Sequence, residues 1–340
     1  MNMSQAVQKV ISNTDLSLQE MQQVMELIMT GQATPAQMGG FLVGLRMKGE
    51  TVQEITGAAQ VMRRLATPVH VDVDYMVDTC GTGGDGVNTF NISTASAFVA
   101  ASAGAHVAKH GNRSVSSSCG SADVLEAAGV SLNLNPEQVA RAIEQVGVGF
   151  MFAAKHHSAV KHVMGTRKEL GIRTIFNVLG PLTNPASAPN QVMGVFDKRL
   201  VRPIAEVLRD LGSEHVLVVH SEDGLDEISI AAPTYVAELK DGDIIEYTIK
   251  PEQFNISRAD IKQLSVHTVE DSLSMIDAAL TQENEAASDI VALNAGAAIY
   301  ASGLESSLAD GVLRAQDCIG SGLAKEKIAE LASYSQLCES

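Results

Sequence analysis

The first 66 residues show the three- and four-residue spacing of apolar positions that is typical of amphipathic helices. The clearest run follows Ser17, where the apolar positions are Met21, Val24, Met25, Ile28 and Met29. On a helix these side chains lie on one face. We interpret this methionine-rich face as core, with a subunit interface as the alternative, because methionine adapts its shape to either setting. The pattern predicts an all-helical N-terminal domain over residues 1–66.

From residue 70 onward the pattern changes to short apolar runs that alternate with helical segments. Predicted strands cover residues 75–79, 105–108, 147–152, 191–196 and 215–220, and predicted helices cover 93–103 and 121–128. This alternation indicates an α/β domain over residues 70–340, with a mainly parallel central sheet and helices on both faces. Residues 234–249 have the pattern of a hairpin that turns at Asp241 and Gly242, and the chain after residue 265 is mostly helical in pattern.

A helical segment is expected between the third and fourth predicted strands. We expect its part near residues 160–185 to return to the N-terminal helices and complete the helical domain. The adjacent His156 and His157 in this region could indicate a metal site. Neighbouring residues on a helix point in different directions, however, and no cysteine or acid lies at ligand spacing. Ordinary polar packing is therefore the favoured interpretation of the pair.

A glycine-rich loop follows the first predicted strand. Its glycines are Gly81, Gly83, Gly84 and Gly86. Glycine allows several consecutive backbone N–H groups to turn toward one anion without Cβ clashes. The loop leads into a helix near Ser93, whose first N–H groups and dipole would face the same anion. A second loop, from Lys109 to Asp123, combines a cation, an amide, a guanidinium and hydroxyl groups, which can wrap phosphate and sugar oxygens.

The distribution of acidic residues supports a polyanionic ligand. The chain carries 40 Asp and Glu residues and a net charge of −16, yet none of these acids lies between Gly86 and Ala122. The average acid content of the chain would place about four there. Lys109 and Arg113 lie within this acid-free window. A ligand rich in negative charge would require such a window.

Taken literally, residues 81–86 also satisfy the G-x-G-x-x-G pattern of dinucleotide-binding folds. That function requires an acid about 20 residues further on to hold the ribose hydroxyls. The next predicted strand leads into Lys109 instead. A phosphate cradle therefore fits better than a nicotinamide or flavin site.

An acidic cluster follows the strand predicted at 215–220. It consists of Glu222, Asp223, Asp226 and Glu227. Opposite a polyphosphate cradle, such carboxylates are expected to hold hydrated Mg²⁺ that bridges to phosphate oxygens. The alternative is a solvated acidic turn. The acid-free window elsewhere in the chain favours the metal site.

Charge, cysteine usage and hydropathy exclude several classes of partner. A net charge of −16 argues against nucleic acid or an anionic membrane as the main partner, because both require a basic face. No apolar stretch is long enough to span a membrane. The four cysteines show no C-x-x-C spacing, and no secretory signal is recognisable at the start, so we expect reduced thiols in a cytoplasmic protein. A catalytic role for Cys80 or Cys119 is disfavoured, because their loops require small residues in any case.

In their order along the chain, the motifs resemble those of the anthranilate phosphoribosyltransferases, and the likeness covers nearly the whole sequence. The matching motifs are DTCGTGGD at residues 78–85, NIST at 91–94, KHGNR at 109–113, RKELGIRTIFN at 167–177 and DGLDE at 223–227. The resemblance implies transfer of a phosphoribosyl group from phosphoribosyl diphosphate to the amine of anthranilate, with release of diphosphate. It also implies two Mg²⁺ ions per subunit and a homodimer joined through the helical domain.

The resemblance also implies which residues form each subsite. Phosphoribosyl diphosphate would contact Gly81, Gly84, Asp85, Thr89, Asn91, Ile92, Ser93, Thr94, Lys109, His110, Gly111, Asn112, Arg113, Ser114, Val115, Ser116, Ser117 and Ser121. Anthranilate would contact Gly81, Asn112 and Arg167, the last through its carboxylate. Ser93 would bind one Mg²⁺, and Asp226 with Glu227 the other.

Pyrimidine nucleoside phosphorylases have a similar Lys-His-Gly loop and are the alternative assignment. They would differ at the first glycine loop and lack the Asp-Gly-Leu-Asp-Glu turn. One departure from the resembled family is Ser158, where a proline is expected after the paired histidines. The aromatic amine of anthranilate is neutral near pH 7, so we assign no general base. His110 is the candidate if one exists.

Overall fold

The structure is a computed structural model that describes residues 1–113 and 119–338. Its strands are β1 (Met76–Gly81), β2 (His106–Gly111), β3 (Val148–Phe152), β4 (Asn190–Gly194), β5 (His215–Ser221), β6 (Thr234–Lys240) and β7 (Asp243–Ile249). The first helices are α1 (Met3–Ile11), α2 (Leu18–Met29), α3 (Pro35–Lys48), α4 (Val52–Leu65), α5 (Ile92–Ser102), α6 (Ser121–Ala127), α7 (Pro136–Val146) and α8 (Ala153–His156). They are followed by α9 (Lys161–Leu170), α10 (Phe176–Leu179), α11 (Val201–Asp210), α12 (Val269–Leu280), α13 (Glu285–Ser302), α14 (Leu308–Ser321) and α15 (Leu323–Leu337).

Each of the four N-terminal helices begins at a side-chain cap. The side chains of Asn2, Ser17, Thr34 and Thr51 each accept a hydrogen bond from the backbone N–H three residues further on. The methionine-rich face of α2 is buried in full, which confirms its interpretation as core. None of the helices in the described ranges is long and apolar enough to cross a membrane.

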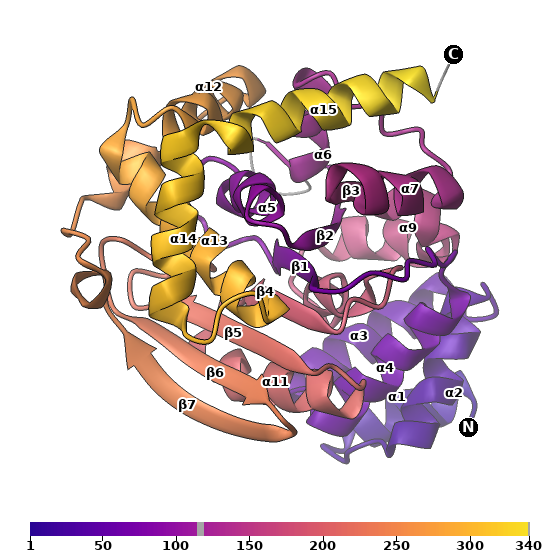
Figure 1. Ribbon diagram of the computed structural model, residues 1–340. Helices are drawn as coiled ribbons and strands as arrows, with labels where there is room; N and C mark the ends of the chain where they lie inside the picture. Colours follow the sequence, from indigo (N-terminus) through magenta and orange to yellow (C-terminus); the bar gives the residue numbers. More distant parts are fainter. Residues whose placement is uncertain (114–118, 339–340) are drawn as a thin grey trace.

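All the predicted strands and the hairpin are present. The sheet has the order β3-β2-β1-β4-β5-β6-β7; β1 to β5 are parallel and the last two strands are antiparallel (Figure 1). The hairpin turns where Asp241 and Gly242 have φ angles of 53° and 84°, as a two-residue turn of this type requires. The mainly parallel sheet is therefore confirmed.

Helices cover both faces of the sheet. Buried residues of α5 and α13 pack against Val77, Val107 and Leu217 on one face, with α14 and α15 outside them (Figure 1). On the other face, α11 and the N-terminal helices share one buried cluster with Met193 and Val218. The apolar interior of the helical domain is thus continuous with that of the sheet.

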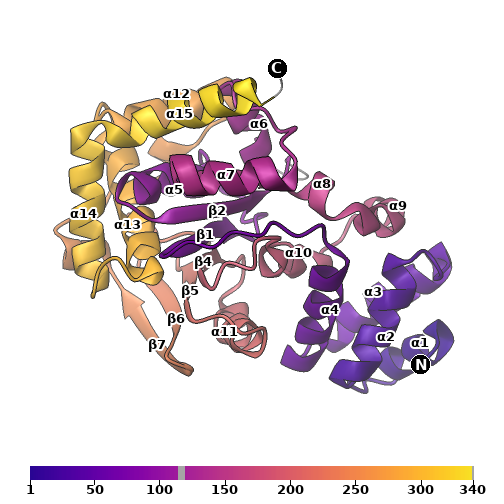
Figure 2. The same ribbon diagram turned by 45° about the vertical axis from the view of Figure 1, so that its right-hand side comes forward.

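Helix α9 lies against α2 and α3 (Figure 2). Val163 of α9, and Ile175 after it, belong to the same buried cluster as the core of α1 to α4. These contacts support the prediction that residues 160–185 complete the helical domain, and we retain that division of the chain as a proposal.

Candidate active site

The loops that follow the parallel strands lie together at one edge of the sheet, where the strands have their carboxyl ends. The strand order reverses between β1 and β4, because β2 lies on the other side of β1. In open α/β sheets such a reversal opens a crevice in which ligands bind. The last residues of the two strands, Gly81 and Gly194, are register partners at this switch point.

The glycine loop starts at this end of the sheet in a conformation that only glycine adopts readily. Gly83, Gly84 and Gly86 have φ angles of 65°, 73° and 82°. The N–H of Gly83 donates to a carboxylate oxygen of Asp226 at 2.7 Å, and the N–H of Thr82 donates to the Gly194 carbonyl at 2.9 Å. The loop is therefore attached to the turn that follows β5.

The far end of the loop is fixed by the segment before α12. Val266 donates its N–H to the Asn88 carbonyl at 2.9 Å, and Thr89 forms a bridge with Ser265. Ser272 of α12 accepts the Asn91 N–H at 3.1 Å and donates its hydroxyl to the Asn91 side chain at 2.8 Å. Sequence reasoning did not identify Ser272, because nothing near it in the sequence indicates this contact.

The start of α5 contains one half-buried and two buried candidates. Ser93 is half-buried at the first turn, whereas Ile92 and Thr94 are buried. The Ile92 side chain belongs to the core against α5. The Thr94 hydroxyl is buried and has no hydrogen-bond partner within the described residues. Ser93 is therefore the candidate of this group with the best access to a ligand.

Lys109 lies at the floor of the site, within a strand rather than in a loop as predicted. Strand β2 continues to Gly111, so successive side chains point to opposite faces of the sheet. The Lys109 ammonium group is on the α5 face, where it donates to the Thr79 carbonyl at 2.6 Å and to the Ser93 hydroxyl at 3.3 Å. His110 is on the opposite face. The predicted loop thus begins three residues later, because the hydrogen-bonded ladder with β3 holds these residues.

A buried carboxylate balances the charge of Lys109. Asp78 is fully buried and accepts hydrogen bonds from the His110 N–H at 3.2 Å and the Asn184 amide at 2.8 Å. Burial lowers the pKa of Lys109, and the negative charge of Asp78 opposes that shift. The fold thus supports a cation in a place where burial alone would disfavour it.

The carboxylates after β5 complete the α5 side of the site. Burial, and after it the nearby Asp85, raises the pKa of Asp226. Burial and the charge of Asp226 raise the pKa of Glu227 well above its usual value, while Lys109 opposes this shift. The backbone of Ser93 also opposes the rise in the pKa of Glu227. Three carboxyl groups thus lie close together, with Lys109 as a nearby cation.

This arrangement fits a hydrated Mg²⁺ ion. The raised pKa values of Asp226 and Glu227 reflect burial and repulsion that a divalent cation would relieve. Within residues 1–113 and 119–338, no three His, Cys, Asp or Glu side chains form a group that could hold a metal by itself. Mg²⁺ does not need such a cage, since it keeps several waters and binds one or two carboxylates together with substrate phosphates.

On the opposite face, His110 forms a buried pair with His157. Their ring centroids are 5.1 Å apart, and the Nε2 atoms of both rings are buried without a partner among the described residues. Sequence reasoning considered His156 and His157 only as a pair; the structure separates them, because His156 bonds to the Thr67 carbonyl at 2.9 Å. Burial lowers the pKa of His110 well below its usual value, so this imidazole is a weak base.

These buried imidazoles are expected to make the protein less stable in mild acid. Burial lowers the pKa of His157 to about 4, whereas a histidine in the unfolded chain has a pKa of about 6.5. The stabilisation from the neutral ring is therefore complete above about pH 6.5 and is lost as the pH falls toward about 4. Urea unfolding of the wild type and His157→Asn across this range measures the effect.

As the pH falls from about 6.5 to about 4, the free energy of unfolding of His157→Asn should decrease less than that of the wild type. Carboxyl groups with raised pKa values have the opposite dependence, but they are present in both proteins and cancel in the difference. Parallel stability curves for the two proteins would contradict a buried neutral His157.

Arg167 lies on α9, half-buried, with its guanidinium carbon 5.4 Å from the centroid of the Phe176 ring. Burial lowers its pKa. Across the described residues, no hydrogen bond or ion pair engages this guanidinium. A half-buried cation without a carboxylate partner is what an anionic substrate would neutralise. Nearby, Ser158 is exposed at the start of a 3₁₀ turn (Ser158–Val160), a position that proline would also fit.

The second predicted loop is described only in part. Ser114, Val115, Ser116 and Ser117 lie outside the described residues. The Asn112 carbonyl accepts the Ser121 hydroxyl at 3.4 Å. Arg113 is exposed and forms ion pairs with Asp123 at 2.8 Å and Glu126 at 2.9 Å. A phosphate would have to compete with these two carboxylates for Arg113.

The two cysteines near the loops are buried. Burial raises the pKa of Cys80 well above its usual value and that of Cys119 to about 11. Both thiols are therefore protonated near neutral pH and are poor nucleophiles. This agrees with the sequence-based prediction that a catalytic role for either cysteine is disfavoured.

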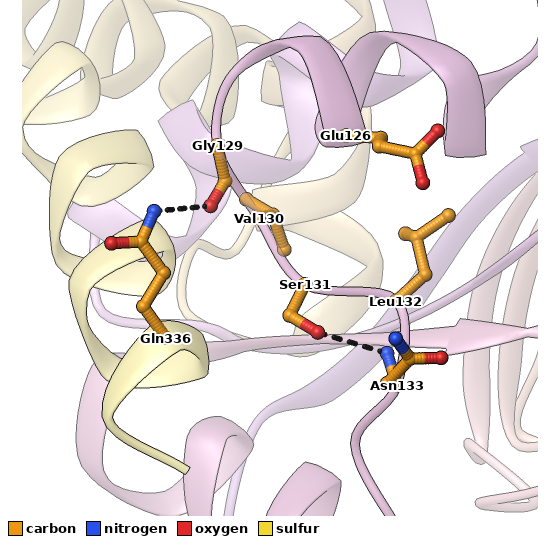
Figure 3. A pocket seen from close by; sticks show the side chains of 7 residues that line it. All are labelled: Glu126, Gly129, Val130, Ser131, Leu132, Asn133 and Gln336. Atoms are coloured by element: carbon orange, nitrogen blue, oxygen red, sulfur yellow. Dashed lines mark hydrogen bonds between the residues drawn. The ribbon is translucent and has the colours of Figure 1, made fainter. Parts of the chain in front are cut away.

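A separate surface hollow of about 250 Å³ lies beyond α6 (Figure 3). Its lining residues are Glu126, Gly129, Val130, Ser131, Leu132, Asn133 and Gln336. Gln336 donates to the Gly129 carbonyl at 2.9 Å, which links this turn to α15. The lining includes an acid and no cation, so the hollow does not suit a phosphate.

Comparisons with known proteins agree with this geometry. Residues 4–66 match the family described as "Glycosyl transferase family, helical bundle domain", and residues 73–325 match "Glycosyl transferase family, a/b domain". The anthranilate phosphoribosyltransferase of Cellvibrio japonicus is 64% identical over 99% of this chain and 99% of its own length. That of a Marinomonas species is 63% identical over 99% of this chain and 98% of its own length.

Solved structures show the same fold. The anthranilate phosphoribosyltransferase of Thermus thermophilus superposes with a TM-score of 0.92 and 42% identity, covering 97% of this chain and 99% of that one. The enzyme of Saccharomyces cerevisiae, solved in complex with PRPP and Mg, gives a TM-score of 0.89 and 25% identity over 98% of each chain.

Proposed function

Because this chain belongs to the anthranilate phosphoribosyltransferase family, we propose that it binds phosphoribosyl diphosphate at the loops that follow the carboxyl ends of β1, β2 and β5. The function that the geometry supports best is transfer of the 5-phosphoribosyl group to the amine of anthranilate, with release of diphosphate, a step of tryptophan biosynthesis. The observation that carries this proposal is the meeting of the glycine loop, Lys109 and the Asp226–Glu227 turn at one end of the sheet.

The residues of the α5 face would stabilise the leaving group. Breaking the bond between ribose C1 and diphosphate leaves positive charge on the sugar and negative charge on the diphosphate. The Lys109 ammonium and the N–H groups at the tip of the glycine loop would be donors that need little reorganisation as this charge develops, whereas the N–H groups of Ile92 and Thr94 in α5 already donate to the Phe90 and Asn91 carbonyls. Holding both substrates in place would bring the amine to C1.

We propose that Asp226 and Glu227 hold Mg²⁺, with Ser93 beside a second ion. When bound, Mg²⁺ supplies neutralisation of the charge on the phosphate oxygens. The convergence of three carboxyl groups supports one ion at the Asp226–Glu227 turn. The second ion rests on the family resemblance and on the half-buried Ser93 hydroxyl, which already accepts a hydrogen bond from Lys109.

We place the acceptor near Arg167, whose guanidinium would pair with the anthranilate carboxylate. Gly81 and Asn112 would complete the subsite from the ends of β1 and β2. No general base is assigned. The aromatic amine is neutral near pH 7, and the lowered pKa of His110 makes that imidazole a poor acceptor of the surplus proton.

Replacing Arg167 by Ala is expected to raise the KM for anthranilate about ten- to hundredfold, because a hydrogen-bonded charged pair contributes about 1.5 to 3 kcal/mol. The KM for phosphoribosyl diphosphate should change little. The exposed neighbour Lys168, mutated to Gln, serves as the control for loss of positive charge on the same helix. Steady-state rates with each substrate varied in turn provide the measurement; an unchanged anthranilate KM would remove Arg167 from the subsite.

The direct test of the activity is a fluorescence assay. Purified protein mixed with anthranilate, phosphoribosyl diphosphate and Mg²⁺ should consume the fluorescent anthranilate, and omission of any one component should stop the loss. Thymidine or uridine with phosphate replaces the substrates in the control for nucleoside phosphorolysis. Persistence of anthranilate fluorescence with active turnover of a nucleoside would contradict the proposed function.

We also propose that the protein is cytoplasmic and that it forms a homodimer. The two subunits would be joined through the helical domain. Ile11 and Met47 support this interface, since they are exposed apolar side chains of α1 and α3 at 62% and 83% exposure. Sedimentation of the wild type and a Met47→Glu variant tests the proposal.

A further inference from the structure

The geometry points to Arg173 as a positioning residue for the glycine loop. This inference rests on the proposed binding of phosphoribosyl diphosphate by that loop. Arg173 is exposed and lies between α9 and α10. Its Nη2 donates a hydrogen bond to the carbonyl oxygen of Gly84, and its guanidinium carbon lies 4.3 Å from the centroid of the Phe196 ring.

The tip of the loop needs such a contact because, among the described residues, backbone pairing joins the loop to the rest of the fold only near its two ends. At the start, Thr82 donates its N–H to the Gly194 carbonyl at 2.9 Å. At the end, the Asn88 carbonyl accepts the Val266 N–H at 2.9 Å, and Phe90 donates its N–H to the Leu264 carbonyl at 3.1 Å. Between these points lie glycines with positive φ angles, which have wide conformational freedom. Arg173 reaches the backbone of this tip from outside the loop.

Anchoring the Gly84 carbonyl fixes the direction of a donor. The peptide unit between Gly84 and Asp85 is planar and trans, so its N–H points opposite to its C=O. When Arg173 holds the Gly84 oxygen, the Asp85 N–H must point away from Arg173. A loop N–H group that is oriented before the substrate arrives needs no reorganisation on binding.

Phe196 supports the same arrangement from the extension of β4. Its ring lies under the Arg173 guanidinium, and its N–H donates to the Thr82 hydroxyl at 3.0 Å. The flat guanidinium can stack on the ring and still donate in its own plane. A lysine at this position could donate to Gly84 but would lack the planar stacking surface. Arginine is thus specifically suited to this position.

The position of Arg173 also joins the two substrate subsites. Arg167 lies in the last turn of α9, whose C-cap is Gly171 with a left-handed φ of 60°, and Arg173 follows two residues after this cap. The segment that carries the proposed anthranilate ligand therefore also holds the loop proposed to bind the phosphoribosyl donor.

The test compares Arg173→Gln, Arg173→Lys and Phe196→Leu with the wild type and with Lys168→Gln. Lys168 is exposed in the same segment and provides a matched loss of one positive charge. We expect Arg173→Gln to raise the KM for phosphoribosyl diphosphate about tenfold, because it loses a charged hydrogen bond. Arg173→Lys and Phe196→Leu should give intermediate values. The KM for anthranilate should stay within about twofold for all of them.

The two KM values and the melting temperature of each variant together separate a positioning role of Arg173 from a general loss of structure. A purely structural role would lower the melting temperature of Arg173→Gln without changing the KM for the donor alone. A donor KM within about twofold of the wild type in Arg173→Gln, or an equal rise in Lys168→Gln, overturns the inference. Ser93→Ala, measured alongside, shows whether a negative result concerns only the role of Arg173 or the whole proposed binding site. If Ser93→Ala raises the donor KM and Arg173→Gln does not, only the role of Arg173 is wrong; if neither does, the site itself is wrong.

Discussion

The double substitution Asp226→Asn with Glu227→Gln should reduce turnover at limiting Mg²⁺ by about 100- to 1,000-fold, since a metal clamp on a leaving phosphate supplies several kcal/mol. Little stability should be lost. Carboxyl groups with raised pKa values destabilise the folded protein when ionised, and that cost is present above their folded-state pKa. Neutral amides remove the repulsion, and Asn can still accept the Gly83 N–H. Initial rates across a Mg²⁺ titration, with a thermal melt, provide the measurement.

Glu222→Gln is the matched control, because Glu222 precedes the same turn but is exposed and accepts the Tyr235 hydroxyl instead. It should retain the Mg²⁺ dependence of the wild type. Full activity of the double variant at limiting Mg²⁺ would contradict the metal role, and a collapsed melt would mean that the two carboxylates serve the fold.

Gly194→Ala should affect both fold and catalysis. A Cβ atom on Gly194 would lie 1.5 Å from the carbonyl oxygen of Asp226 and 2.4 Å from its carbonyl carbon. Both groups are backbone, so the turn after β5 must move outward. We expect a stability loss of about 1 to 3 kcal/mol from the forced shift. Displacing a metal-binding turn by about 1 Å should lower kcat/KM about 100-fold.

Gly165→Ala is the control, because a Cβ there meets no atom within 4 Å. It lies inside α9, where alanine should stabilise the helix by about 0.5 to 1 kcal/mol. Urea unfolding and steady-state kinetics of both variants provide the comparison. A Gly194→Ala enzyme with wild-type kcat/KM would show that the turn tolerates displacement and does not position the reaction.

Local sequence signals predicted most of the elements. The apolar face that follows Ser17, the alternation of strands and helices, and the turn at Asp241 and Gly242 each depend on a few neighbouring residues. The glycine loop was also local, since positive φ angles require glycine. Such features can be predicted because the interaction that decides them lies within a few positions.

The sequence did not predict as well which face of the sheet each candidate side chain lies on. The sequence placed the end of the second strand before Lys109, whereas the ladder with β3 extends it to Gly111. That extension places Lys109 and His110 on opposite faces, which divides a run that the sequence presents as one phosphate loop. The local pattern of apolar and polar positions does not reveal a cross-strand hydrogen bond to a distant segment.

Contacts between distant segments were missed for the same reason. Gly194 is one glycine in an apolar run, and only the turn above it explains why a side chain is excluded. Arg173 lies in a recognised motif, but its partners Gly84 and Phe196 come from two other loops. The sequence has no acid between Gly86 and Ala122, yet the fold brings Asp226 into hydrogen-bond contact with Gly83, just before that window.

The most direct measurement is an anomalous diffraction experiment on crystals soaked with Mn²⁺ and phosphoribosyl diphosphate. The account predicts the diphosphate between the glycine loop and Lys109, with a Mn²⁺ peak within coordinating distance of Asp226 or Glu227. A donor bound on the His110 face of the sheet, or metal peaks remote from the turn after β5, would contradict it.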